Sequence, residues 1–142
     1  MEILIYFARL CAATNSDKLS DPDMGDSAIV ETLGLGAFAM SASPAVAQFL
    51  GVGGWAEARR YTEEMLEITA GRHPHLRLPT FDELGAPCGI DVRKVVETAV
   101  VPWINTGIAH RQAGIGQIGA GVVQAPLPCF VQALEAFAAA YL

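Results

Sequence analysis

The sequence predicts an α+β fold: several helices packed with a small sheet that contains a strand–glycine-rich loop–strand unit, followed by a C-terminal amphipathic helix. Two observations support this prediction. Helical periodicity dominates the earlier part of the 142-residue chain, and two short runs that favour strands come late, on either side of a glycine-rich stretch. Because these strands do not alternate with helices, a small separate sheet is favoured over a doubly wound one.

The first predicted helix covers residues 27–41, with Asp26 as its N-cap, after a polar and turn-rich segment at residues 14–25. Gly34 and Gly36 lie inside this helix, and each lowers helix stability by about 1 kcal/mol relative to alanine. Close approach of another backbone is the usual compensation. We therefore expect this helix to be central.

Two more helices are expected before residue 71. Ser43 and Pro44 are typical of an N-cap and a first helical position, and they predict a short helix at residues 45–50. Residues 55–70 place their apolar and small side chains on one side, which predicts a helix that stops at Gly71.

The next segment is harder to assign. Residues 72–90 hold three prolines and few periodic positions, so they predict an ordered crossing in which residues 76–78 can be extended. Asp91 is expected to cap a short helix at residues 92–98.

The late part of the chain predicts two strands and a helix. Residues 100–108 are rich in β-branched side chains and predict a buried strand despite Pro102, and residues 118–123 predict a second one. A helix is expected at residues 128–141. Its apolar stripe follows i, i+4, i+7 and i+11 spacing and consists of Phe130, Leu134, Phe137 and Tyr141.

Composition restricts the function classes. Hydrophobic residues make up 52% and charged residues 17%, which indicates either a dense core or an apolar surface covered by another polypeptide. The net charge is −6, and only Lys18 and Lys94 among nine basic residues are lysines. Without a cationic face, neither nucleic acid nor an anionic membrane surface is an expected partner. No apolar run has transmembrane length, and residues 3–11 lack a basic leader region.

The cysteines and histidines do not predict a metal site. Cys11, Cys88 and Cys129 are far apart and odd in number, which is typical of buried free thiols in a reducing cytoplasm. His73 and His75 lie close together, but no third ligand is near them in the sequence. We expect neither a metal nor a cofactor.

The densest group of polar and glycine residues lies at 105–121. A small planar anion, such as a carboxylate, carbamoyl or phosphate group, suits this composition because arginine offers a bidentate fork and glycines let backbone N–H groups approach closely. We predict His110 and Arg111 as catalytic residues, since an imidazole can act as acid, base or hydrogen-bond donor near neutral pH. The substrate-binding residues expected in this stretch are Asn105, Thr106, Gly116, Gln117 and Gly119. The alternative is a glycine-rich hairpin whose polar groups satisfy one another.

Within this stretch, Gly114, Gly116 and Gly119 match the dinucleotide pattern G-x-G-x-x-G. That pattern functions where it opens a long helix, with an acidic residue about 20 positions later. Here the following segment is strand-like and Pro126 comes soon after it, so we do not expect a dinucleotide site.

An acidic group surrounds the start of the first predicted helix: Asp21, Asp23, Asp26 and Glu31. Their carboxylates could bind a cation, but we favour N-capping by Asp26 and solvation of the others. The free N–H groups of the helix start can instead receive an anion, so Asp26 and Ser27 are also predicted to bind substrate.

Arg93 is the remaining candidate for substrate binding. It either pairs with Glu97 on the surface of the short helix at residues 92–98 or faces the substrate.

Four segments resemble blocks of the YlbE-like family and occur in the family's order. They are DMGDSAIVET (23–32), GIDVRKVVET (89–98), INTGIAHR (104–111) and GIGQIGAG (114–121), the last followed by a Pro-x-x-Cys-Phe helix. The resemblance implies a larger α+β protein in which residues 23–142 correspond to the C-terminal domain. Residues 1–22 do not resemble the family, which a truncated or frame-shifted reading frame would explain.

The resemblance also implies a function. Members are associated with FdrA and a third subunit in oxamate carbamoyltransferase, which interconverts oxalurate and phosphate with oxamate and carbamoyl phosphate in anaerobic allantoin catabolism. A cytoplasmic location is expected. The transcarbamoylase motif Ser-x-Arg-Thr is absent, so the chemistry would be of a different design or lie partly in a partner subunit. The alternatives are a non-catalytic assembly module and an inactive truncated fragment.

Overall fold

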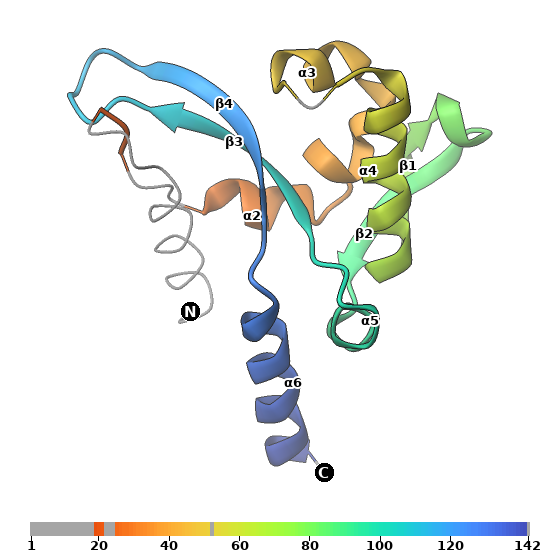
Figure 1. The fold of residues 1–142 in the computed structure, drawn as a ribbon. Coiled ribbons are helices and arrows are strands. Elements are labelled where there is room, and N and C mark those ends of the chain that lie inside the picture. Colours follow the sequence, from red (N-terminus) through yellow and green to blue (C-terminus); the bar gives the residue numbers. More distant parts are fainter. Residues whose placement is uncertain (1–18, 22–24, 52, 142) are drawn as a thin grey trace.

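The computed structural model describes residues 19–21, 25–51 and 53–141, and within them it confirms the α+β class (Figure 1). Two antiparallel hairpins, β1–β2 and β3–β4, each form a two-stranded sheet. The helices are α2 (Asp26–Glu31), α3 (Pro44–Phe49), α4 (Trp55–Ile68), α5 (Val92–Thr98) and α6 (Leu127–Tyr141), with 3-10 helices η1 (Gly36–Ala42) and η2 (Pro79–Phe81). The strands are β1 (Thr69–Leu78), β2 (Leu84–Ile90), β3 (Trp103–Ala109) and β4 (Gln117–Gln124).

The long helix expected at residues 27–41 is wrong, because the chain forms α2 and η1 with a turn between them. The reason is backbone conformation at the two glycines. Gly34 has φ of 101° and Gly36 has φ of 54°, values that end a right-handed helix and that glycine adopts without a steric penalty. The expected central position is nevertheless found at η1, which contributes to both hydrophobic clusters described below.

The crossing expected at residues 72–90 is instead the β1–β2 hairpin, and Gly71 is not a helix stop. Helix α4 ends at Ile68, and β1 begins at the next residue. Strand β1 has an irregular register between Arg72 and Arg77, and this irregular part includes Pro74, which cannot donate a ladder hydrogen bond. The strand is polar and mostly exposed, so its sequence lacks the apolar alternation by which strands are recognised.

Several other elements were predicted correctly. Helix α3 begins with Ser43 as N-cap and Pro44 as first residue, and α5 begins after Asp91, whose side chain accepts the N–H of Arg93 at 3.0 Å. Strands β3 and β4 lie close to where the late runs indicated, separated by the glycine-rich loop, and α6 follows them. The expectation that the first of these strands is buried is wrong, since Ile104 is the one buried residue of β3.

The core consists of two hydrophobic clusters. The first is Phe38, Met65, Ile68, Val95, Ile104 and Ala125. The second is Ala37, Met40, Ala47, Ala58 and Tyr61. Because Phe38 belongs to one cluster and its neighbour Ala37 to the other, η1 joins the two halves of the core.

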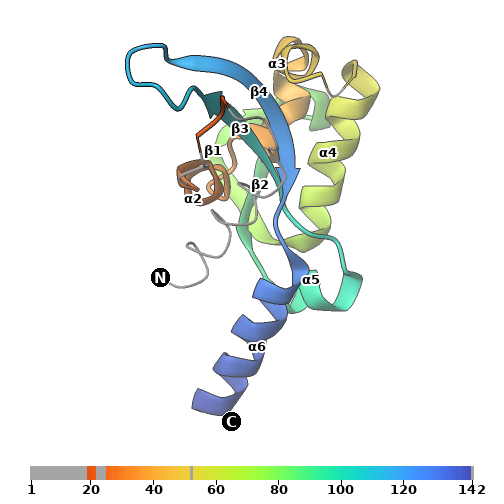
Figure 2. The same cartoon turned by 60° about the vertical axis from the view of Figure 1, so that its left-hand side comes forward.

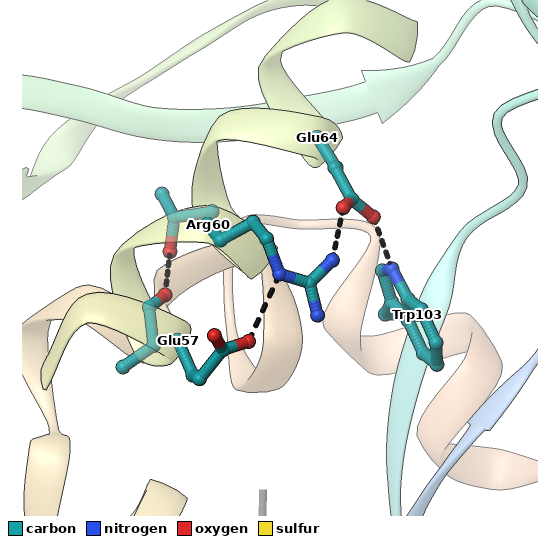
Figure 3. Close-up of polar contacts among 6 residues, drawn as sticks. Glu57, Arg60, Glu64 and Trp103 are labelled. Carbon is teal, nitrogen blue, oxygen red and sulfur yellow. Dashed lines mark hydrogen bonds and ion pairs between the residues drawn. The ribbon is translucent and has the colours of Figure 1, made fainter. Parts of the chain in front are cut away.

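Trp103, the first residue of β3, fixes this strand to α4 (Figure 3). Its indole Nε1–H donates to Glu64 Oε2 at 2.5 Å, and its ring meets Tyr61 edge to face with centroids 4.8 Å apart. Glu64 also pairs with Arg60, whose Nε donates to Glu57 Oε2 at 2.9 Å. The contacts hold the start of β3, and with it the residues that follow in the strand.

Two further findings concern the cysteines and the apolar character of the helices. Of the described cysteines, Cys88 is half-buried and Cys129 is buried, and both are free thiols, whereas Cys11 lies outside the described residues. None of the helices in the described ranges combines the length and apolar character that a membrane span needs.

Candidate functional site

The most unusual polar group of the described chain is the buried carboxyl of Glu31, at the end of α2, where α2, η1 and β3 meet. Its side chain is 7% exposed. Oε2 accepts the N–H of Ala37 at 3.0 Å, and both carboxyl oxygens lie 3.0 Å from the N–H of Asn105 in β3. A Cβ on Gly36 would lie 2.0 Å from Glu31 Cδ, so glycine is required to leave room for this carboxyl. Glu31 therefore ties three elements together.

Burial raises the pKa of Glu31 to about 7, and the two backbone hydrogen bonds lower it only in part. In the described part of the chain, η1 and β3 make the main contacts with α2, and neither contains a charged residue that could offset the burial. Glu31 can thus exchange a proton near neutral pH, a property that is common in functional sites and also occurs in structural networks.

The stability of the fold is expected to depend on pH through Glu31. Its pKa is raised above the ordinary 4.5, so the folded state holds the proton more tightly. This stabilising contribution is complete below pH 4.5 and is lost as pH rises through about 7. The loss is about 3 kcal/mol of unfolding free energy between these limits.

Urea unfolding at pH 5, 6, 7 and 8 tests this expectation by comparing the wild type with Glu31→Gln, which cannot ionise. The difference between the two proteins should shift in favour of the glutamine variant as pH rises. Glu67→Gln, at an exposed position of α4, is the matched control and should follow the wild-type pH profile. Parallel profiles for the wild type and Glu31→Gln would contradict the assignment.

Asn105 and Thr106 follow each other on β3 opposite Val122 and Gly121 of β4. The Asn105 side-chain Oδ1 is buried and has no hydrogen-bond partner among the described residues. A buried amide oxygen without a donor is uncommon and costly. A ligand with a hydrogen-bond donor would therefore be stabilised beside Asn105 Oδ1, next to the Glu31 carboxyl.

The catalytic residues predicted from the sequence lie at the tip of the β3–β4 hairpin, at one end of the molecule (Figure 1). His110 N–H donates to the Gly116 carbonyl at 2.9 Å, and its ring Nδ1 accepts the N–H of Gln112 at 2.9 Å. Arg111 is exposed; its backbone N–H donates to Leu19 O at 2.9 Å. Its guanidinium reaches Ser20 O at only 3.5 Å, a weak contact that leaves donors directed to solvent.

The glycine and amide residues of the tip are only partly engaged. Gly116 has φ of 85°, and no atom lies within 4 Å of a Cβ built there, so its backbone borders open space. Gln117 Nε2 donates to the Gly119 carbonyl at 2.9 Å, and Gly119 pairs with Ile108 in the ladder. The structure thus brings His110, Gly116 and Gln117 into one hairpin, in which some polar groups satisfy one another, as the alternative interpretation expected.

Asp26 and Ser27 lie at the start of α2, which packs against β3. Asp26 is the first helical residue, and the N-cap is Gly25 in a left-handed conformation, so the predicted capping role of Asp26 is wrong. The expectation that Glu31 is solvated is also wrong, since it is buried. Asp23 lies outside the described residues.

Arg93 is not brought to the hairpin tip. It lies on α5, at the other end of the molecule in both views (Figures 1 and 2). Its guanidinium pairs with Asp91 through Nη2–Oδ2 at 2.7 Å and Nε–Oδ1 at 3.0 Å, instead of the expected Glu97. The hydrogen bond from Arg93 is the largest cause that lowers the pKa of Asp91 to about 2. Among the candidates, Arg93 is therefore the one separated from the rest.

Within residues 19–21, 25–51 and 53–141, no three His, Cys, Asp or Glu side chains form a group that could hold a metal ion. What the sequence missed is the burial of Glu31. The signal that could have indicated it is the pair Gly34 and Gly36, three and five positions after Glu31, which allows the chain to fold back over that side chain.

The chain is similar to parts of two longer proteins. Over 123 residues the chain is 58% identical to "Oxamate carbamoyltransferase subunit AllG" of Escherichia coli (strain K12). The match covers 87% of this chain and 29% of AllG. It is also 45% identical over 112 residues to the uncharacterized protein YahG of the same organism, covering 79% of this chain and 24% of YahG. No family model matches the chain.

A solved structure shares the fold. It is a conserved protein of unknown function from Enterococcus faecalis V583, with a TM-score of 0.77 and 52% sequence identity over 84% of this chain and 28% of that one. The chain therefore spans less than a third of the length of each relative that it matches. The similarity to AllG supports the family kinship that the sequence blocks indicated, while the YlbE-like name and the link to FdrA stay predictions.

Proposed function

We propose that this chain forms part of a subunit of an oxamate carbamoyltransferase complex. The observation that carries the proposal is the 58% identity to AllG over 123 residues. The reaction proposed is transfer of the carbamoyl group of oxalurate from the oxamate nitrogen to a phosphate oxygen. A carbon–nitrogen bond breaks, a carbon–oxygen bond to phosphate forms, and the oxamate nitrogen takes up a proton.

The proposal includes partners and a place in the cell. An FdrA-like protein and a third subunit complete the complex, and the substrates are small anions of anaerobic allantoin catabolism in the cytoplasm. The family resemblance of residues 23–142 supports these assignments. Because the match covers 29% of AllG, the rest of the active site would come from parts outside the match and from the partner subunits.

Within this chain, the proposed anion-binding region is the β3–β4 hairpin tip. Arg111 has guanidinium donors directed to solvent, and Gly116 borders open space, so both can approach a carboxylate or phosphate. His110 lies beside them and would supply or accept the proton at the departing nitrogen. Asn105, Thr106, Gln117 and Gly119 would line the hairpin toward Glu31, with Asp26 and Ser27 on the adjoining helix α2. Arg93 lies on α5, away from the hairpin tip, so it would contact a substrate only at a site formed together with a partner subunit.

Arg111→Ala is expected to weaken binding of carbamoyl phosphate about tenfold or more, because one charge-assisted, bidentate contact is lost. Calorimetry would be done on an AllG chimera in which residues of this chain replace the matched region, assembled with the partner subunits. Arg77→Ala is the matched control, since Arg77 lies on β1 and donates to the Glu83 carbonyl. Equal affinities for the wild type and Arg111→Ala would show that the hairpin tip is not part of the binding site.

A non-catalytic assembly module is the second candidate. The observation that favours it is the amount of apolar surface left open, including Leu33 at 58% and Tyr141 at 75% exposure. Co-purification with an FdrA-like protein, without any change in its activity on addition of this chain, would support this role over the catalytic one.

A further inference from the structure

Helix α6 carries an apolar stripe whose last two residues, Phe137 and Tyr141, are not covered by the described part of the chain. The helix packs at its start, where Cys129 is buried and Leu127 and Phe130 contact the first core cluster. Beyond this turn α6 extends away from the rest of the molecule (Figures 1 and 2). Phe137 is 58% exposed and Tyr141 75% exposed, and their rings contact each other with centroids 4.8 Å apart.

Helix α6 has fewer charged side chains than a helix that is surrounded by water usually has. Its 15 residues include one charged side chain, Glu135. Isolated helices of this length are marginally stable in water, and most helical stability in proteins comes from packing of an apolar face. Contiguous exposed aromatic surface is typical of an interface. The last turns of α6 therefore need a packing partner.

The length of the relatives offers a candidate for that partner. The matched region makes up 29% of AllG, 24% of YahG and 28% of the Enterococcus faecalis protein. The same fold is thus embedded, in each relative, in a polypeptide of which more than two thirds lies outside the match. An apolar stripe with a single acidic residue favours an apolar protein surface over a strongly charged ligand.

We propose that the exposed end of the α6 stripe, Phe137 and Tyr141, packs against the polypeptide that forms this remaining part of AllG-like proteins. The contact would be a mainly hydrophobic interface between α6 and the rest of the polypeptide. It concerns packing alone and is independent of the proposed carbamoyl transfer, because the tip of the β3–β4 hairpin, which carries His110 and Arg111, and helix α6 lie at different ends of the molecule (Figure 1).

The test co-expresses the full 142-residue chain with the tagged portion of Escherichia coli AllG that lies outside the 123-residue match. Light scattering after size-exclusion chromatography should show a 1:1 complex. The double variant Phe137→Glu with Tyr141→Glu should weaken its affinity about tenfold or more, because two aromatic anchors are lost. Phe49→Glu is the matched control, since Phe49 is 71% exposed but lies on α3 at the other end of the molecule.

Circular dichroism of each variant checks that the chain stays folded, and if the double variant unfolds, Tyr141→Glu alone takes its place. Three results would overturn the proposal: no complex with the AllG portion, a complex equally tight with the α6 variant, or a homodimer of this chain that the α6 variant dissociates. The last result would assign the stripe to a second copy instead.

Discussion

Glu31→Ala is expected to lower the free energy of unfolding by about 3–5 kcal/mol at pH 6, because one buried and one partly buried backbone N–H group lose their acceptor and a cavity remains. The groups left without a partner are the backbone N–H of Ala37, at the start of η1, and that of Asn105 in β3. Because η1 joins the two core clusters, loss of its anchor should loosen both. Urea unfolding followed by circular dichroism measures the change.

Glu31→Gln is the informative partner of this variant, since it keeps an acceptor oxygen and a similar volume. It should retain most of the stability that the alanine variant loses. A loss equally large in both variants would contradict the role of the side-chain oxygen as the acceptor that holds Ala37 and Asn105 together.

Gly85→Ala should produce the second large effect, a loss of about 3 kcal/mol or separation of the β1–β2 hairpin, because overpacking against rigid backbone cannot be relieved by a rotamer change. A Cβ at this position would lie 2.1 Å from the carbonyl oxygen of His73 and 3.2 Å from Arg72 Cβ. The backbone itself would have to move. Thermal unfolding, together with proteolysis in the hairpin, detects the change.

Gly71→Ala is the matched control in the same hairpin, since no atom lies within 4 Å of a Cβ built at Gly71. Its stability should stay within about 1 kcal/mol of the wild type. Equal stability of the Gly85→Ala and Gly71→Ala variants would show that the two strands are farther apart at Gly85 than described.

Elements with strong local signals could be predicted from the sequence. Ser43 and Pro44 define a helix start by their own backbone preferences, as Asp91 does through its side chain, and α6 has a clear apolar period. The β1–β2 hairpin could not be predicted in this way, because it is exposed, polar and interrupted by Pro74. Its register depends on partners 6 to 21 positions away in the chain, from Leu78↔Leu84 to Thr69↔Ile90.

The candidate site also contains one part that local sequence patterns predict and one part that they do not. The hairpin that carries His110, Arg111 and Gly116 follows from the strand–glycine–strand pattern, and the structure brings these residues together. The buried role of Glu31 could not be predicted, because its acceptor contact with Asn105 joins residues 74 positions apart, and a glutamate on a short helix is ordinarily solvated. The position of Arg93 depends on how α5 packs, which no local pattern determines.

Carbamoyl transfer by a complex that contains this chain is the most direct measurement of the proposed function. The AllG chimera, assembled with an FdrA-like protein and the third subunit, would be supplied with oxamate and carbamoyl phosphate, and the release of phosphate with formation of oxalurate would be followed. We predict activity comparable to that of the AllG complex and a clear loss in the Arg111→Ala variant. A chimera that folds and assembles but forms no oxalurate would contradict the proposed function.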